Sequence, residues 1–173
     1  MAMLEVKNIS ISFGGLKAVN DFSVTIEKGQ LYGLIGPNGA GKTTVFNLLT
    51  GVYKPDTGTI LLDGKNITGR STIEINQDGI ARTFQNIRLF QKMSVLDNVM
   101  VGMHVKTRLP FPQNLIPGRA DKVRKEAEAR AEELLKILGL YEVRYEMATS
   151  LPYGDQRKVE ICRALASEPK LLL

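Results

Sequence analysis

A glycine-rich stretch near the start of the chain carries the strongest chemical signal. Residues 36–44 read Gly-Pro-Asn-Gly-Ala-Gly-Lys-Thr-Thr, so that Gly36 and Gly41 are separated by four residues and Lys42 and Thr43 follow at once. This is the spacing of a phosphate-binding loop. Because glycine has no Cβ, such a backbone can curl around an anion with its N–H groups pointing inward. The stretch therefore predicts a binding site for the phosphates of a nucleoside triphosphate.

Two side chains of this loop have distinct predicted roles. Lys42 would add a full positive charge for the β- and γ-phosphates, and the hydroxyl of Thr43 would hold Mg²⁺. A plain glycine turn between a strand and a helix is the alternative, and the complete motif disfavours it. The residues expected to contact the nucleotide here are Gly36, Pro37, Asn38, Gly39, Ala40, Gly41, Lys42, Thr43 and Thr44.

The elements on either side of the loop fit this chemistry. The apolar run 31–35 predicts a buried parallel strand, and residues 44–50 predict a helix that ends at Gly51. The positive N-terminal end of that helix would point at the phosphates. A strand, a glycine-rich loop and a helix in this order are what the motif requires.

The other elements are predicted from the spacing of apolar residues. Strands are expected over residues 3–13, 22–27, 59–62 and 80–84, helices over 94–103, 121–138 and 152–166, and the start of a buried strand over 170–173. The first strand has an imperfect alternation around Asn8. The helix over 121–138 is the clearest, because its apolar residues form one stripe and Gly139 follows it.

The composition is that of an ordinary folded domain. The chain has 173 residues, is 43% hydrophobic and carries a net charge of +5, which is too mild to indicate a partner. No apolar run reaches the roughly 18 residues of a membrane span. Cys162 is the single cysteine and is expected to be buried and unreactive, and His104, the single histidine, is expected to have a surface or packing role. These two residues cannot form a zinc site of the usual kind.

Two later stretches accompany the loop. Residues 83–86 read Thr-Phe-Gln-Asn, and residues 151–157 read Leu-Pro-Tyr-Gly-Asp-Gln-Arg directly before a predicted helix. With these motifs in this order, the chain resembles the nucleotide-binding subunit of an ATP-binding-cassette (ABC) transporter over essentially its whole length. Residues 79–90 and 153–157 look most like the ATPases of branched-chain amino-acid importers.

The resemblance implies a fold and a domain organisation. The expected fold is α/β, a phosphate-loop NTPase core with an N-terminal antiparallel β-subdomain and a helical subdomain, with the end of the parallel sheet missing. Residues 1–173 would form a single, incomplete ATP-binding domain. Its parts would be a nucleotide-binding lobe over 1–85, a mostly helical lobe over 86–150, and the signature helix with the start of the Walker B strand over 151–173.

The resemblance also assigns residues to ATP and Mg²⁺. Gln85 matches the Q-loop glutamine, and its neutral amide oxygen would face the metal ion or the attacking water, so Gln85 and Lys42 are the predicted catalytic residues. Phe13 matches the aromatic residue that stacks on adenine. A plain core or edge phenylalanine is the alternative for Phe13. Tyr32 is the second aromatic candidate, for which we expect a packing role instead.

The signature stretch departs from the family pattern at two positions. Pro152 replaces a serine and Asp155 replaces a glutamine, so a hydroxyl that would touch the partner's γ-phosphate is lost. Proline and an early aspartate both suit the first turn of a helix. Gly154 is therefore the expected contact to the ATP that the opposite subunit holds, whereas Pro152 and Asp155 match by position only.

The chain ends before three groups that the family uses for hydrolysis. The Leu-rich run of the family continues into Asp-Glu, and a histidine follows later; here no carboxylate follows Glu168. Phosphoryl transfer depends on the positioning of such groups. We therefore expect a C-terminally truncated piece of an ATPase that binds nucleotide without turnover.

The implied partners are a second ABC ATPase subunit, identical or different, bound head-to-tail, and transmembrane permease subunits. A periplasmic or extracellular substrate-binding protein would act indirectly, and the chain would be peripheral at the cytoplasmic face of the cell membrane. Branched-chain amino acids are the expected cargo, and urea, other amides or lipopolysaccharide are alternatives. An ABC ATPase acting on nucleic acid or ribosomes is a further alternative, disfavoured by the single cassette, the absence of a basic run and the few aromatic residues.

Overall fold

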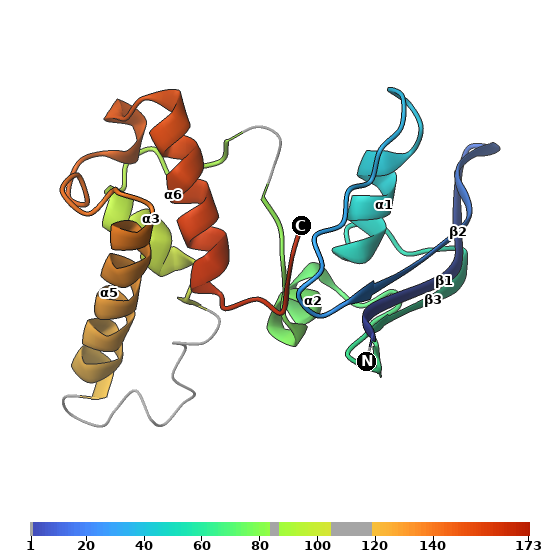
Figure 1. The fold of residues 1–173 in the computed structure, drawn as a ribbon, viewed down its shortest axis with the longest axis horizontal. Helices are drawn as coiled ribbons and strands as arrows, with labels where there is room; N and C mark the ends of the chain where they lie inside the picture. The colour runs from blue at the N-terminus through green and yellow to red at the C-terminus, as the bar shows by residue number, and fades with distance from the viewer. Residues whose placement is uncertain (1, 84–86, 105–118) are drawn as a thin grey trace. The chain divides into compact units, whose positions relative to one another are not determined.

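The computed structural model describes residues 2–83, 87–104 and 119–173. The chain divides into two compact units, one of Met1–Ile80 with Leu173 and the other of Ala81–Leu172. Each unit is described by itself. In Figure 1 the first unit contains the strands β1 to β3 and the helices α1 and α2, and the second contains α3, α5 and α6.

The first unit is built on a four-stranded antiparallel sheet. Its strands are β1 (Ala2–Phe13), β2 (Leu16–Glu27), β3 (Thr57–Leu62) and β4 (Lys65–Asn66), in the order β2-β1-β3-β4. β1 and β2 form a hairpin in which Phe13 pairs with Leu16. The predicted strands 3–13, 22–27 and 59–62 are confirmed, and β2 begins earlier than predicted.

The imperfect alternation of β1 has a structural cause at Asn8. This residue has a φ of 51°, and the register between β1 and β2 shifts between Val6 and Ile9. Because a bulge inserts one extra residue, the side-chain parity changes there. Leu4 and Val6 before the bulge and Ile9 and Ile11 after it are consequently all buried.

The predicted strand over 31–35 is wrong for this structure. These residues form no regular element, and Leu31 and Ile35 are almost fully exposed. A strand is held by hydrogen bonds to a neighbour. Within the described ranges, no strand pairs with this segment. Residues 31–35 are mostly apolar, as a buried strand requires. A strand also needs a neighbouring strand to pair with, and the composition of the segment does not show whether one is present.

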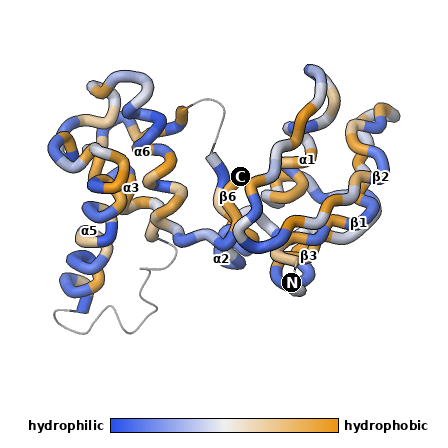
Figure 2. The backbone as a smooth tube through the Cα atoms, viewed as in Figure 1, coloured by the Kyte–Doolittle hydropathy of each residue, from blue (hydrophilic) through white to orange (hydrophobic). Residues whose placement is uncertain are grey.

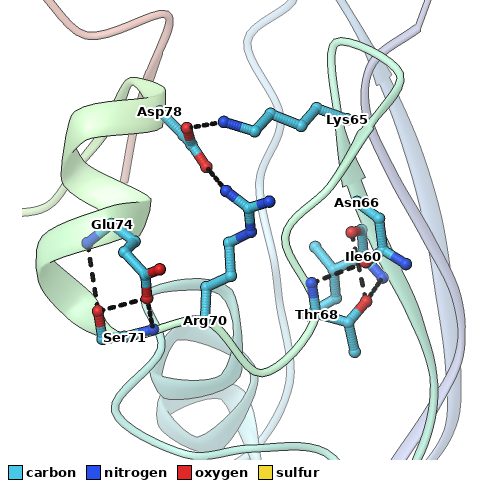
Figure 3. Close-up of polar contacts among 8 residues, drawn as sticks. All are labelled: Ile60, Lys65, Asn66, Thr68, Arg70, Ser71, Glu74 and Asp78. Carbon is cyan, nitrogen blue, oxygen red and sulfur yellow. Dashed lines mark hydrogen bonds and ion pairs between the residues drawn. The ribbon is translucent and has the colours of Figure 1, made fainter.

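The helix after the loop is confirmed, and a second helix was not predicted. α1 (Lys42–Leu49) ends before Gly51, which has a φ of 71°. α2 (Thr72–Asp78) begins with a capping box between Ser71 and Glu74 (Figure 3). The Ser-x-x-Glu spacing at 71–74 is the sequence signal that could have identified this helix.

Polar contacts hold α2 to the strand β4 and to the turn before the helix. The Ser71 hydroxyl lowers the pKa of the Glu74 carboxyl. At the other end of α2, Asp78 forms ion pairs with Lys65 and with Arg70, the latter at 3.0 Å (Figure 3). The hydrogen bond from Lys65 is the main cause that lowers the pKa of Asp78. At the N-terminus of α2, the N–H groups of Ser71 and Glu74 thus already have acceptors within the chain.

The second unit is helical. It contains α3 (Val95–Val101), α5 (Arg119–Ile137), the 3-10 helix η2 (Ala148–Ser150) and α6 (Tyr153–Ala166), in agreement with the three predicted helices. Figure 2 shows that α5 is largely hydrophilic, and of its predicted apolar stripe Ala127, Ala131, Leu134 and Leu135 are buried. These residues pack in one core with residues of α3 and α6.

A short pair of strands accompanies these helices. β5 (Ile80–Ala81) forms a two-stranded sheet with β6 (Leu171–Leu172). The start of a strand near 170–173 is therefore confirmed, but its burial is not, because Leu172 is exposed. The predicted strand 80–84 is shorter in the structure, and residue 84 lies outside the described residues.

Cys162 is predicted to resist thiol reagents in the folded protein. Its side chain is fully buried, and burial raises the pKa of the thiol from 9.0 to about 11. Since the folded-state pKa is raised, the thiol's contribution to stability is intact below pH 9 and is lost as the pH rises toward 11. We expect alkylation by iodoacetamide at pH 8 to be slow and to become fast in denaturant. Rapid alkylation of the folded chain at pH 8 would contradict this burial.

Candidate phosphate-binding site

The phosphate loop is organised around the side chain of Lys42. Its Nζ atom donates to the carbonyl oxygens of Gly36 and Pro37, at 2.5 and 2.6 Å. The ammonium group therefore lies against the backbone of the loop, between its first residues and the start of α1. Thr43 is exposed and Thr44 is half-buried. A cation held in this way is available to an anion that approaches the loop.

The N-terminus of α1 has the features of an anion site. No side chain of the described residues caps it, and its first turn contains no acidic residue. Since the first N–H groups of a helix have no partner within the helix, they can bind a phosphate. This differs from α2, whose N-terminus is closed by Ser71 and Glu74. Of these two helices in the same unit, α1 thus has an N-terminus without a side-chain cap, whereas the N-terminus of α2 is capped.

Position 41 requires a glycine for two reasons. Its φ is 79°, in the left-handed region that side chains disfavour. In addition, a Cβ at this position would collide with the backbone carbonyl of Ala18 in β2. The loop is therefore packed tightly against the antiparallel sheet at the residue that precedes Lys42. The residues present fit the triphosphate of ATP, since the backbone donors at the start of α1 and a lysine occur together.

Phe13 lies at the end of β1 and is 43% exposed, so the alternative of a buried core residue does not hold. Its ring contacts the ring of Tyr53 edge-on, with centroids 5.1 Å apart. Tyr53 was not singled out from the sequence. Tyr32, for which packing was expected, is instead 56% exposed in the irregular segment before the loop, so that expectation was wrong.

Gln85 lies outside the described residues, so its predicted role toward the metal stays a prediction. Arg88 and Phe90, a few residues later, are held by two polar side chains of the helical unit, one buried and one half-buried. Asn98 of α3 is fully buried, accepts from the N–H of Phe90 at 2.8 Å and donates to the carbonyls of Phe90, Met93 and Ser94. The sequence analysis did not identify Asn98, because its burial is visible only in the structure.

The second of these side chains belongs to α6. Arg163 donates to the carbonyl of Arg88 at 2.6 Å, and its guanidinium lies 5.8 Å from the ring centre of Phe90. Burial lowers the pKa of Arg163, and Glu160 acts in the opposite direction. Arg88 and Phe90 are therefore attached to the same helix that carries the signature stretch.

The signature stretch begins α6 as expected, with one correction. Pro152 occupies the N-cap position rather than the first turn, and its carbonyl accepts from the N–H groups of Asp155 and Gln156. The Asp155 carboxylate forms an ion pair with Lys158 at 2.7 Å, on its own helix. Gly154 is exposed, and a Cβ there would meet nothing within 4 Å. The negative charge of Asp155 is thus partly balanced within its own helix.

The single histidine was expected to have a surface or packing role. His104 is exposed, and the described residues contain no group of three or more metal-ligating side chains of the His, Cys, Asp and Glu types. Among the same residues, no helix is long and apolar enough to cross a membrane. The phosphate loop with its neighbours is thus the best-defined site.

Comparison with known protein families matches residues 19–173 to a family described as ABC transporter. The branched-chain amino acid transport ATP-binding protein LivG of Salmonella typhimurium is 41% identical over 172 residues, which cover 99% of this chain and 68% of LivG. BraF of Pseudomonas aeruginosa, a protein of the same description, has the same identity and coverage. The lipopolysaccharide export ATP-binding protein LptB of Escherichia coli is 35% identical over 173 residues, or 66% of its length.

Solved structures show the same relationship. The ATP-binding cassette MJ1267 of an ABC transporter superimposes with a TM-score of 0.84 at 34% identity, and the match covers 99% of this chain and 68% of that one. The chain therefore has the phosphate-loop ATPase fold with an antiparallel β-subdomain and a helical subdomain, over about two thirds of a full cassette's length. The chain belongs to the ABC transporter family, as one of its ATP-binding proteins.

Proposed function

We propose that this chain is the ATP-binding subunit of an ABC importer for branched-chain amino acids. The observation that carries the proposal is the 41% identity to LivG and BraF over 99% of the chain. The phosphate loop supports it, because Lys42 and the open N-terminus of α1 supply a cation and backbone donors together. Binding of ATP is the activity that these residues fit best.

We propose the following roles for individual residues. Residues 36–44 would surround the phosphates, with Lys42 neutralising the β- and γ-oxygens and Thr43 holding Mg²⁺. The metal ion, when bound, would polarise the phosphates. Phe13 would stack on adenine, and Gln85 would face the metal and the attacking water. Gly154 would approach the ATP of a second subunit bound head-to-tail.

The proposed partners follow from membership of the family. A pair of ATP-binding subunits would act on transmembrane permease subunits at the cytoplasmic face of the membrane, and a substrate-binding protein would deliver the cargo. Within the 173 residues, no carboxylate follows Glu168. Because fast phosphoryl transfer needs a positioned base and metal support, we propose that a polypeptide of these residues binds ATP without steady turnover.

Uptake measurements in the source cells test the cargo. Deletion of the gene is expected to abolish energy-dependent uptake of labelled leucine, isoleucine and valine. The complete native gene should restore uptake when reintroduced, and the same gene with Lys42→Ala should not. Normal leucine uptake in the deletion strain would contradict the proposal. Loss of urea uptake or of lipopolysaccharide export in its place would assign the subunit to one of those transporters.

A further inference from the structure

The residue proposed to stack on adenine stands at an exposed hairpin end. Phe13 is the last residue of β1, and the hairpin turns through Gly14 and Gly15, both with positive φ. Leu16, its partner in β2, is 72% exposed. Two-stranded ribbons of this kind are marginally stable by themselves. A ring in such a place needs support from another element to keep a fixed position.

The segment that follows α1 supplies this support. The Asp56 carboxylate accepts from the N–H of Ser12 at 2.9 Å, and the N–H of Asp56 donates to the carbonyl of Ser10 at 2.8 Å. These two bonds hold the end of β1 beyond its pairing with Thr57 of β3. Tyr53, three residues earlier, packs edge-on against the Phe13 ring.

The same segment is attached to α1. The N–H groups of Val52 and Tyr53 both donate to the carbonyl of Asn47, at 2.9 and 3.2 Å. At Gly51, where φ is 71°, a Cβ would collide with the carbonyl of Arg70 and lie 2.8 Å from Cδ1 of Ile75. The turn after α1 is therefore closely packed. It links the helix that begins at Lys42 to the ring of Phe13.

We propose that Tyr53 and Asp56 are positioning residues for the adenine ring. They hold Phe13 at a fixed place relative to α1, so that the base and the phosphates of one nucleotide can be bound at once. Phe13 remains 43% exposed and Tyr53 38% exposed, which leaves ring surface open to a base. This inference rests on the proposed function, because it concerns the same ATP.

The test compares two ligands that share only the phosphates. The dissociation constants of ATP and of inorganic tripolyphosphate are measured by calorimetry on the 173-residue chain. Tyr53→Leu and Asp56→Ala are expected to weaken ATP binding by about threefold to tenfold, and Phe13→Ala by about tenfold or more, the size of one base–aromatic stack. Tripolyphosphate binding should stay within about twofold in all three variants, because the loop is unchanged.

Two further variants separate positioning from a general structural effect. Tyr53→Phe keeps the ring and should bind ATP as the unchanged chain does. The same is expected of Tyr145→Leu, the control at an exposed tyrosine of the helical unit. In the Phe13→Ala background, Tyr53→Leu should cause no additional loss, since Tyr53 acts through Phe13.

The outcomes are distinct. Full ATP affinity in Tyr53→Leu and Asp56→Ala overturns the inference, and so does an equal loss of ATP and tripolyphosphate. If the unchanged chain binds tripolyphosphate and ATP with the same dissociation constant, the base contributes nothing and the inference is overturned. Phosphate binding at the loop would still stand. An unchanged chain that binds neither ligand overturns the proposed function and this inference with it.

Discussion

Replacement of Lys42 by methionine is expected to weaken ATP binding by about tenfold to a hundredfold. The reason is that a hydrogen bond to a charged group contributes about 1.5–3 kcal/mol, and each 1.4 kcal/mol changes an affinity about tenfold. Methionine keeps an unbranched side chain but has no donor. The contacts of Lys42 to Gly36 and Pro37 lie at the partly exposed loop, so stability should change little. Equilibrium binding of a fluorescent ATP analogue measures the effect.

Lys28→Met is the matched control, because Lys28 is an exposed lysine of the same unit and lies outside the loop. It should bind the analogue as the unchanged chain does. Equal affinity in the Lys42 variant would show that this ammonium does not contact the phosphates. The same proteins test turnover: steady ATP hydrolysis by the 173-residue chain, above the rate of the Lys42 variant, would refute binding without hydrolysis.

Replacement of Gly102 by alanine is expected to destabilise the helical unit by about 3 kcal/mol, at the upper end for overpacking. Gly102 follows α3 with an ordinary helical φ of −60°, so the backbone tolerates alanine. The obstacle is steric, because an added Cβ would collide with the carbonyl of Arg163 and lie 3.1 Å from the Cβ of Ala166 in α6. Backbone atoms cannot give way as a flexible side chain does. Chemical denaturation followed by circular dichroism measures the change.

Gly154→Ala is the matched control in the same unit. Nothing lies within 4 Å of the added Cβ, and alanine favours a helix over glycine by about 1 kcal/mol. Gly102→Ala should therefore lower the denaturant concentration at the midpoint of unfolding of the helical unit. Gly154→Ala should raise that midpoint or leave it unchanged. An equal loss in both variants would show that the close approach of α3 and α6 does not limit stability.

Local sequence signals predicted most helices correctly. The Ser94 cap and the apolar stripe of 121–138 gave α3 and α5, because capping and spacing are properties of neighbouring residues. The capping box at Ser71 is the same kind of local signal for α2. Predictions of strands, which depend on pairing with a neighbouring strand, were less accurate: the strand predicted over 31–35 does not form. A strand depends on a partner that lies elsewhere in the sequence.

The phosphate loop itself was determined by the sequence, since its glycines, lysine and threonine act through their own backbone and charge over nine consecutive residues. What only the tertiary structure decided is how other segments serve it. The collision that fixes Gly41 comes from Ala18, and the support of Phe13 comes from Tyr53 and Asp56. These contacts join residues far apart in the chain. No spacing rule describes them, because the fold of the sheet around α1 creates them.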